Sequence, residues 1–379
     1  MPPNKMRVTV VGGGIVGLAH AYAAARRGFD VTLFERNERA QGASVRNFGL
    51  IWPIGQPAGD GLRLALRSRE IWLEMLDGAG MPYLATGSLH AAYRDDEEAV
   101  GREFAETGPG QGYDCRWLPT AEALIRSQAL VADGLRGALW SATEITVDPR
   151  IVLARVPEFL AERYGVKLEY GHAVRVAAPP VVETARGKFE ADRVIVCAGD
   201  DFETLFPQVF AAAGLVRTKL QMMRTPPQPN GWQLGPALAG GLTMRYYPSF
   251  ELCSSLGALK RRVAEETPEF DRWGIHVMLS QTAAGEITIG DSHEYGRSVD
   301  VFDKPEIDDL ILGALRGFAR LPVMQIARRW HGVYARHGSK LYLHEKPAEG
   351  VDVVTVTRGV GMTLSFGLGE QTVAAWGQG

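Results

Sequence analysis

The sequence predicts a two-domain protein: a Rossmann-like α/β dinucleotide-binding domain, interleaved along the chain with an α+β domain that has a mainly antiparallel sheet. Two observations predict this class. The first 36 residues follow the pattern of strand, glycine turn, helix and strand, which is one βαβ unit. Residues 215–300 instead alternate like strands between proline-containing loops, which is typical of an antiparallel sheet.

The opening unit is the clearest passage. Residues 8–11 form a short β-branched run that predicts a buried parallel strand. A glycine turn follows at 12–17, and the Ala-rich segment 18–27 predicts a helix that stops at Gly28. A second strand is expected over 31–34, and Glu35 closes the unit.

The remaining elements follow from periodicity and capping signals. Asp148-Pro149 predicts an N-cap with proline at the first helical position, opening a helix through Tyr164. Apolar spacing predicts further helices over 62–76 and 303–318, and apolar or alternating runs predict strands at 166–170, 193–199, 220–223, 244–247, 285–290 and 351–357. We place the dinucleotide-binding domain at 1–86, 145–214 and 322–379, and the substrate domain at 87–144 and 215–321.

Composition excludes several classes of protein. Hydrophobic residues make up 46% of the chain and the net charge is only -3, which excludes a disordered chain. The sequence also lacks the basic excess or basic stripe that is typical of a nucleic-acid-binding protein. Three cysteines, Cys115, Cys197 and Cys253, are too few for a disulfide scaffold. Without a long apolar run or a secretory signal, we expect a cytoplasmic protein with no membrane segment. Its eight histidines show no metal-ligand spacing, so no metal is expected.

Gly12, Gly14 and Gly17 match the G-x-G-x-x-G pattern of a dinucleotide site. In a chain with 44 glycines the spacing alone is weak evidence, but here the motif follows a strand, opens a helix and precedes the acidic Glu35. The first glycine permits the tight turn, the second lets the backbone approach a pyrophosphate, and the third lets helix and strand pack closely. The alternative is a plain glycine-rich turn.

Four passages resemble one known family. They are the opening unit with Glu35-Arg36, residues 42–49, residues 194–199 and residues 359–365. Together, and in this order, they are similar to the flavin-dependent amine oxidoreductases related to D-amino acid oxidase, glycine oxidase and sarcosine oxidase. The passage 197–207 resembles more particularly a branch of that family associated with phosphonate breakdown.

The resemblance implies an FAD-binding domain of the glutathione-reductase type and FAD as cofactor. It places the flavin next to the glycine loop before the last helix, where backbone N–H groups at a helix start meet negative charge. For Arg46 a surface salt bridge is the alternative. The residues that the resemblance implies for FAD binding are Gly12, Gly14, Ile15, Val16, Gly17, Glu35, Arg36, Ser44, Arg46, Asn47, Val174, Ala198, Gly199, Gly361, Met362, Thr363 and Leu364.

In this family the flavin performs the oxidation and the protein orients the amine, so we expect positioning residues more than an acid–base pair. The candidates are Tyr246, Tyr247, Trp330, His331, Tyr334 and Arg336. In a strand, Tyr246 and Tyr247 face opposite sides, so only one is expected to line the substrate pocket. For both tyrosines and for His331, structural packing is the alternative.

Two departures from the family pattern refine the expectation. Amino-acid-oxidising members carry a carboxylate-binding arginine where this chain has Tyr334, and a phenol cannot replace a bidentate guanidinium. Arg336, Arg328 and Arg245 are therefore the candidates for binding an anionic substrate group. Sarcosine oxidases attach flavin through a cysteine that aligns near Gly332; none is near here, so non-covalent FAD is expected.

These observations predict an FAD-dependent enzyme that oxidises the C–N bond of a small amine, with imine hydrolysis to an aldehyde and reoxidation by O2. The expected substrate is an aminophosphonate, 2-aminoethylphosphonate or an N-methylated form. One alternative is a glycine- or sarcosine-type oxidase or dehydrogenase of a carboxylated amine. A second is a non-catalytic flavin-binding subunit.

Overall fold

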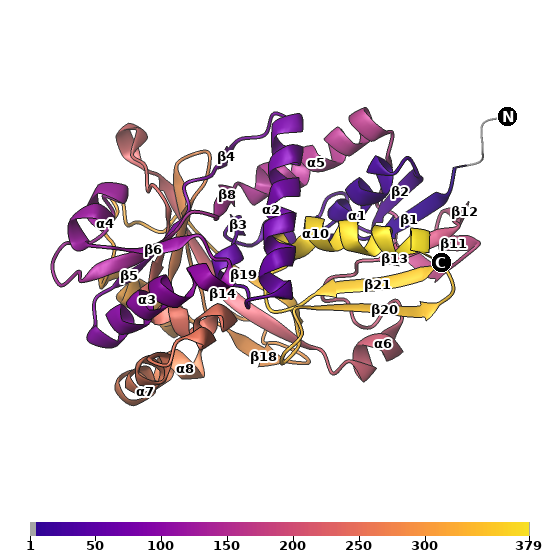
Figure 1. The fold of residues 1–379 in the computed structure, drawn as a ribbon. Helices are drawn as coiled ribbons and strands as arrows, with labels where there is room; N and C mark the ends of the chain where they lie inside the picture. Colours follow the sequence, from indigo (N-terminus) through magenta and orange to yellow (C-terminus); the bar gives the residue numbers. More distant parts are fainter. Residues whose placement is uncertain (1–4, 379) are drawn as a thin grey trace.

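The computed structural model describes residues 5–378 and places two sheets side by side, each with its own helices (Figure 1). One sheet has six strands in the order β20-β21-β13-β1-β2-β9. All neighbours are parallel except β20, which runs antiparallel to β21. Its strands are β1 (Arg7–Val11), β2 (Asp30–Glu35), β9 (Lys167–Tyr170), β13 (Arg193–Val196), β20 (Tyr342–Ala348) and β21 (Val351–Val356).

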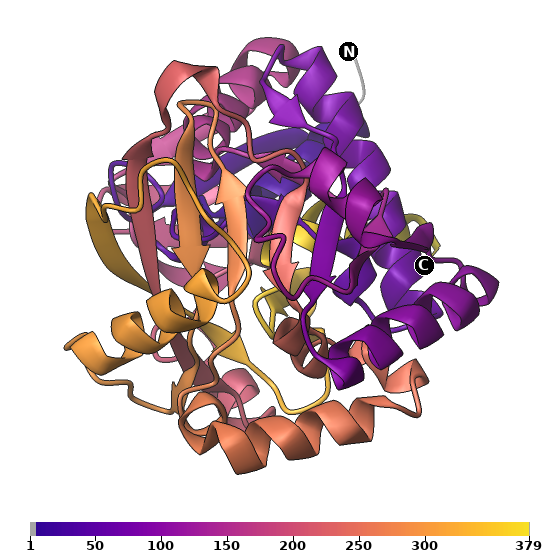
Figure 2. The same ribbon diagram turned by 90° about the vertical axis from the view of Figure 1, so that its left-hand side faces the viewer.

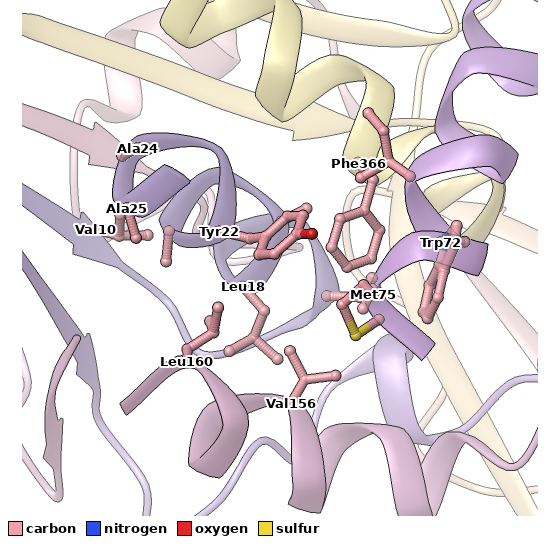
Figure 3. Packing of buried hydrophobic residues seen from close by; sticks show 14 of the residues in the cluster. Val10, Leu18, Tyr22, Ala24, Ala25, Trp72, Met75, Val156, Leu160 and Phe366 are labelled. Atoms are coloured by element: carbon pink, nitrogen blue, oxygen red, sulfur yellow. The ribbon is translucent and has the colours of Figure 1, made fainter. Parts of the chain in front are cut away.

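Helices α1 (Ile15–Arg26), α2 (Asp60–Gly78), α5 (Pro149–Tyr164) and α10 (Gly361–Ala374) pack together beside this sheet (Figure 3). Phe366 is central to this packing, because its ring lies edge-on to Tyr22 at 5.7 Å and to Trp72 at 4.6 Å. Gly369 permits close contact of α1 and α10, since a Cβ there would lie 2.8 Å from the Ala19 carbonyl oxygen. The packing fixes where α10 begins.

The second sheet has nine strands and is mainly antiparallel, as predicted, with one parallel pair between β15 and β5. Figure 2 shows its strands standing in the middle of this half of the molecule with helices around them. The strands are β5 (Ser88–Ala92), β6 (Cys115–Leu118), β7 (Gly137–Ser141), β14 (Val216–Pro227), β15 (Ala237–Gly240), β16 (Met278–Gln281), β17 (Glu286–Gly290), β18 (Glu294–Gly296) and β19 (Arg328–Arg336).

Shorter elements complete the fold. The helices around the nine-stranded sheet are α3 (Asp95–Thr107), α4 (Thr120–Arg126), α7 (Leu256–Glu266), α8 (Pro268–Arg272) and α9 (Pro305–Arg316), and α6 (Pro207–Ala212) lies near the six-stranded sheet. Two three-stranded sheets consist of β10 (Val174–Ala178), β11 (Val181–Thr184) and β12 (Gly187–Glu190), and of β3 (Leu50–Ile51), β4 (Tyr83–Leu84) and β8 (Ile145–Val147). No helix of residues 5–378 is long and apolar enough to cross a membrane.

The position of β19 differs from the predicted division of the chain. This strand lies within 322–379, which we assigned to the dinucleotide-binding domain, yet it pairs along its whole length with β14 of the nine-stranded sheet. The register sets Gly332 opposite Leu220 and Tyr334 opposite Thr218. The chain therefore passes through the second sheet once more before returning to β20 and β21, and β19 brings residues of that sheet toward the start of α10.

Candidate active site

A cavity of about 370 Å³ extends between the two sheets and is lined by both. We call one part the nucleotide end; it is lined by residues that include Gly12, Gly14, Glu35, Ser44 and Val174. We call the other part the sheet end; it is lined by Tyr246, Tyr247, His276, Asp291, His293, Tyr295, Tyr334, Arg336 and Arg358. The start of α10 lies along the same cavity.

The glycine turn has the shape that a dinucleotide requires. Gly12 has a φ of +108°, and a Cβ there would lie 2.3 Å from the carbonyl oxygen of Cys197. A Cβ on Gly17 would lie 1.9 Å from the carbonyl oxygen of Gly12, so only glycine lets α1 pack onto the turn. At Gly14 a Cβ would meet only Ser44, with its Oγ at 3.1 Å, because the remaining space belongs to the cavity.

Glu35 and Ser44 fix the start of α1. Glu35 Oε2 accepts a hydrogen bond from the backbone N–H of Gly13 at 2.8 Å, and its Oε1 accepts one from Asn37 N–H at 2.9 Å. The carboxylate keeps further acceptor sites for ribose hydroxyls. Ser44 Oγ accepts from Ile15 N–H at 3.0 Å. The first N–H groups of a helix have no partner within the helix, so this end attracts phosphate.

Most other predicted cofactor residues also line the cavity, namely Ile15, Val16, Arg36, Arg46, Asn47, Val174, Ala198 and Gly199. Arg46 forms no salt bridge within the described residues; its Nη1 donates to the His331 carbonyl oxygen at 3.3 Å. This excludes the alternative of a surface ion pair. Arg36 is held by Asp201, at 2.9 Å. Asn47 Nδ2 donates to the carbonyl oxygens of Ala43 and Ser44 and stabilises their turn.

The segment 197–207, which resembles the phosphonate-associated branch, follows β13 and is tied to β14 through Arg217. Asp201 caps its own turn by accepting from Thr204, and the Asp200 carbonyl oxygen accepts from Arg217 at 2.7 Å. Several of its residues line the cavity, among them Ala198, Gly199, Asp200 and Asp201. These contacts organise the chain after β13 and hold it against β14.

The last glycine loop brings the start of α10 to the cavity. Gly361, Met362 and Thr363 line it, while the Leu364 N–H donates to the Val360 carbonyl oxygen at 3.0 Å and Leu364 is fully buried. The expectation that Leu364 offers its N–H to a cofactor is therefore wrong, because that N–H closes the first helical turn. Thr363 Oγ1 accepts from Trp52 N–H at 2.9 Å and ties the helix start to the chain before α2.

These features fit FAD. A glycine cradle, a carboxylate at the end of β2 and two helix N-termini lie along one cavity, which is the set that an extended dinucleotide needs. Gly12, Gly14, Glu35 and Ser44 would hold the ADP half, and the N–H groups at the start of α10 would face the flavin.

FAD should come off the protein without breaking a bond. Burial raises the pKa of the Cys115 and Cys253 thiols to about 12 and raises that of Cys197 as well, so none is a ready nucleophile. The space beside Gly332 is filled by Leu220 and Arg46. Acid precipitation of the yellow protein should leave all of the flavin in the supernatant. Colour retained in the washed pellet would contradict non-covalent binding.

The sheet end contains both predicted tyrosines. The prediction of a strand over 244–247 is wrong: residues 241–246 form a 3₁₀ turn, so Tyr246 and Tyr247 do not alternate across a sheet and both line the cavity. Tyr246 stacks on His276 with ring centroids 4.5 Å apart, and Tyr247 meets the same ring edge-on at 6.0 Å. His293 and Tyr295 extend the stack toward β18.

Arg336 and Arg358 enter the sheet end together. Arg336 lies over the Tyr295 ring at 4.2 Å, and Arg358 lies on the turn between β21 and α10. That turn is held to β19 because the Arg358 N–H donates to the Ala335 carbonyl oxygen at 3.2 Å. Within residues 5–378 neither guanidinium forms an ion pair with a carboxylate. Burial and the neighbouring charge of Arg336 lower the pKa of Arg358.

Four other candidates lie outside the cavity lining. Trp330 Nε1 donates to the Arg46 carbonyl oxygen at 3.1 Å, and His331 Nδ1 lies 2.8 Å from Asp303 Oδ1. Arg245 is turned into the protein, where it donates to the carbonyl oxygens of Leu242 and Ile275, and Arg328 is exposed. We therefore expect no direct contact of these four residues with substrate. They either hold neighbouring segments through hydrogen bonds or lie on the surface of the sheet.

Tyr334 occupies the position that the family resemblance assigns to a carboxylate-binding arginine. It lines the cavity, and its ring packs against Gly359, where a Cβ would lie 3.2 Å from the ring. Burial raises the pKa of Tyr334, so the phenol is neutral and can donate a hydrogen bond to a substrate anion without carrying charge.

Sequence reasoning missed His276, which precedes β16, and Asp291 and His293, which follow β17; the pairing of these two strands brings them together. They are all buried, and one donor atom from each lies within 4.8 Å of the others; among the described residues this is the one such group. The imidazole planes of His276 and His293 are parallel to within 8° in a stack at 5.2 Å.

Comparison with known proteins agrees with this cofactor site. A model of the DAO family, described as FAD dependent oxidoreductase, matches residues 7–375. Glycine oxidase from Geobacillus kaustophilus is 24% identical over 207 residues, 52% of this chain and 55% of that protein, so the chain matches about half the length of that relative. One of the subunits of opine oxidase from Agrobacterium tumefaciens is 24% identical over 96% of this chain and 92% of its own.

Solved structures share the fold. L-proline dehydrogenase from P. horikoshii superimposes with a TM-score of 0.75 at 22% identity, covering 100% of this chain and 95% of that one. The match of the family model across nearly the entire chain, on top of a complete dinucleotide cradle, places the protein in the DAO family of FAD dependent oxidoreductases.

Proposed function

We propose that this protein oxidises the C–N bond of a small amine that carries a doubly charged anionic group, with an aminophosphonate such as 2-aminoethylphosphonate or its N-methyl form as substrate. The single observation that carries the substrate class is the pair Arg336 and Arg358. Two guanidiniums face one cavity without a carboxylate partner in the described chain, and a single carboxylate cannot neutralise both. A phosphonate dianion can.

Bound FAD supplies the redox chemistry by accepting a hydride equivalent from the carbon next to the amine nitrogen. The protein's own residues orient that carbon. Arg336 and Arg358 hold the anionic group in the sheet end, and Tyr334 adds a neutral hydrogen-bond donor in the same part of the cavity. The rings of Tyr246 and Tyr247 exclude water from the amine end. The iminium product would react with water to give an aldehyde and ammonia or methylamine, with O2 as the proposed final electron acceptor.

A second candidate is oxidation of a carboxylated amine, which the similarity to glycine oxidase and to the opine oxidase chain favours. Against it stands Tyr334, since a carboxylate would then have to use Arg336 or Arg358 and leave the other guanidinium unpaired. An unpaired, half-buried charge is unfavourable.

Paired substrates test the proposal. We expect kcat/KM, measured by peroxide release, to be at least about tenfold higher for 2-aminoethylphosphonate than for β-alanine, which has the same carbon chain, because one charged hydrogen bond is worth about 1.5–3 kcal/mol. N-methyl-2-aminoethylphosphonate, glycine and sarcosine complete the series. If the carboxylates are turned over as well as the phosphonates, the proposed preference for a phosphonate is wrong, while the proposed oxidation of amines still holds.

A further inference from the structure

The sheet end of the cavity contains one carboxylate. The other acidic residues that line the cavity, Glu35, Asp200 and Asp201, all belong to the nucleotide end, where Glu35 and Asp201 make the contacts described above. Asp291 follows β17 and lies among Tyr247, His276 and His293. A ligand that fills this mainly aromatic part of the cavity has to place a positive charge near the carboxylate, because an unpaired charge away from water is unfavourable.

Asp291 is buried beside His276 and stays ionised. Its Oδ1 lies 3.0 Å from His276 Nε2, and its side chain is only 8% exposed. Burial opposes its charge, but the contact with His276 outweighs that effect and keeps the pKa of Asp291 below its usual value. The His276 ring cannot turn away freely, because the Tyr246 ring stacks on it at 4.5 Å and the His293 ring at 5.2 Å.

The sheet end therefore contains both positively and negatively charged groups. Arg336 and Arg358 supply positive charge, and Asp291 supplies negative charge in the same chamber. A ligand that matches both has an anion at one end and a cation at the other, which is the form of an amino acid or aminophosphonate at neutral pH. Burial lowers the pKa of His293 to about 4, so this histidine is neutral and does not compete as a cation.

We propose that Asp291 is the residue that recognises the substrate's ammonium group, with His276 as the positioning residue that holds its carboxylate. This inference rests on the proposed function only in assuming that the ligand is an amine. It goes beyond that function in that the amine binds in its protonated form and is recognised by its positive charge.

The test uses ligands that cannot be oxidised. In (2-amino-2-methylpropyl)phosphonate the carbon next to nitrogen has no hydrogen, and neopentylphosphonate has the same shape with a methyl group in place of the amine. Dissociation constants of both are measured with the FAD-loaded protein through the change in flavin absorption. In the wild type the amine ligand should bind about 10- to 100-fold more tightly than its alkyl counterpart, as expected for a charged hydrogen bond.

Asp291→Asn keeps the shape of the side chain and removes its charge. The preference for the amine ligand should fall to about one, while neopentylphosphonate should bind at least as well as before because a negative charge has left the chamber. Asp303→Asn is the matched control, since Asp303 pairs with Lys219 and His331 outside the cavity, and should keep the wild-type preference. An unchanged preference in Asp291→Asn, or equal loss of both ligands, would overturn the proposal.

A measurement on the wild type keeps the proposal testable if Asp291→Asn fails to fold. With each dissociation constant corrected for the fraction of that phosphonate present as the dianion, ammonium bound to a carboxylate gives an affinity ratio of the two ligands that stays flat between about pH 6 and pH 8, because the amine is protonated throughout. Binding of the neutral amine would instead weaken the ratio tenfold per pH unit on acidification and would contradict the role of Asp291.

The carboxylate pair 3-amino-3-methylbutanoate and 3,3-dimethylbutanoate separates this proposal from the proposed function. If only the carboxylates bind, the phosphonate substrate is wrong, and their ratio still decides the role of Asp291. If the phosphonates bind without preference for the amine, the phosphonate site stands and the role of Asp291 is refuted. Failure of all four ligands to bind refutes both.

Discussion

Arg336→Ala should lower kcat/KM for 2-aminoethylphosphonate by about thirty- to a thousandfold with the flavin spectrum unchanged. Arg336 lies at the sheet end of the cavity, stacked over Tyr295, and has no acidic partner within residues 5–378. Losing a charged hydrogen bond to the substrate costs about 2–4 kcal/mol. Because the contact binds the anion in the ground state as well as during reaction, much of the loss should appear in KM.

Arg328→Ala is the matched control for this prediction. Arg328 lies at the opposite end of the same strand, β19, but is exposed and outside the cavity lining. It should retain wild-type kinetics. If Arg328→Ala loses as much activity as Arg336→Ala, the loss reflects damage to β19, and the assignment of Arg336 to the substrate anion is wrong.

Gly14→Val should yield a colourless protein. The backbone at Gly14 borders the cavity, and an added Cβ would meet only Ser44, whose Oγ at 3.1 Å would have to shift slightly. The methyl groups of valine would occupy the space that a pyrophosphate needs. The apoprotein should also melt at a lower temperature, since bound ligand stabilises the folded state by mass action. Flavin content per chain and the melting temperature measure both effects.

Gly257→Val supplies the control for that substitution. Gly257 lies in α7 at negative φ with nothing within 4 Å of an added Cβ. It should keep full flavin content with at most a small loss of stability from the lower helix propensity of valine. A yellow Gly14→Val protein with normal flavin content would show that the pyrophosphate lies elsewhere.

Local sequence patterns predicted the nucleotide end well, because the signals lie within one stretch of chain. Residues 8–11 form β1 within Arg7–Val11, the helix is α1, and Glu35 ends β2 beside the turn. Asp148 caps α5 as predicted: its side chain accepts from Arg150 N–H, Pro149 is the first helical residue and Tyr164 the last. Each of these depends on contacts between near neighbours in sequence.

The sheet end could not be predicted in the same way, because it is assembled from distant segments. The alternation at 244–247 suggested a strand, but Tyr247 packs against Gly55 and Met278, and these contacts favour a turn. His276 and Asp291 are 15 residues apart and meet through strand pairing, which no local pattern encodes. One sequence feature could have pointed to Arg358, namely its position directly before Gly359 of the last glycine loop. Arg358 comes close to Arg336 because that loop contacts β19.

Anaerobic titration of the FAD-loaded protein with 2-aminoethylphosphonate tests the central claim most directly. If the protein is an amine oxidoreductase whose arginine pair selects a dianion, the flavin absorption band should bleach completely at low ligand concentration, with one aldehyde formed per flavin, and β-alanine should require a much higher concentration. A flavin that stays oxidised with 2-aminoethylphosphonate, its N-methyl form, glycine and sarcosine alike would contradict the account and leave a protein that binds FAD without oxidising small amines.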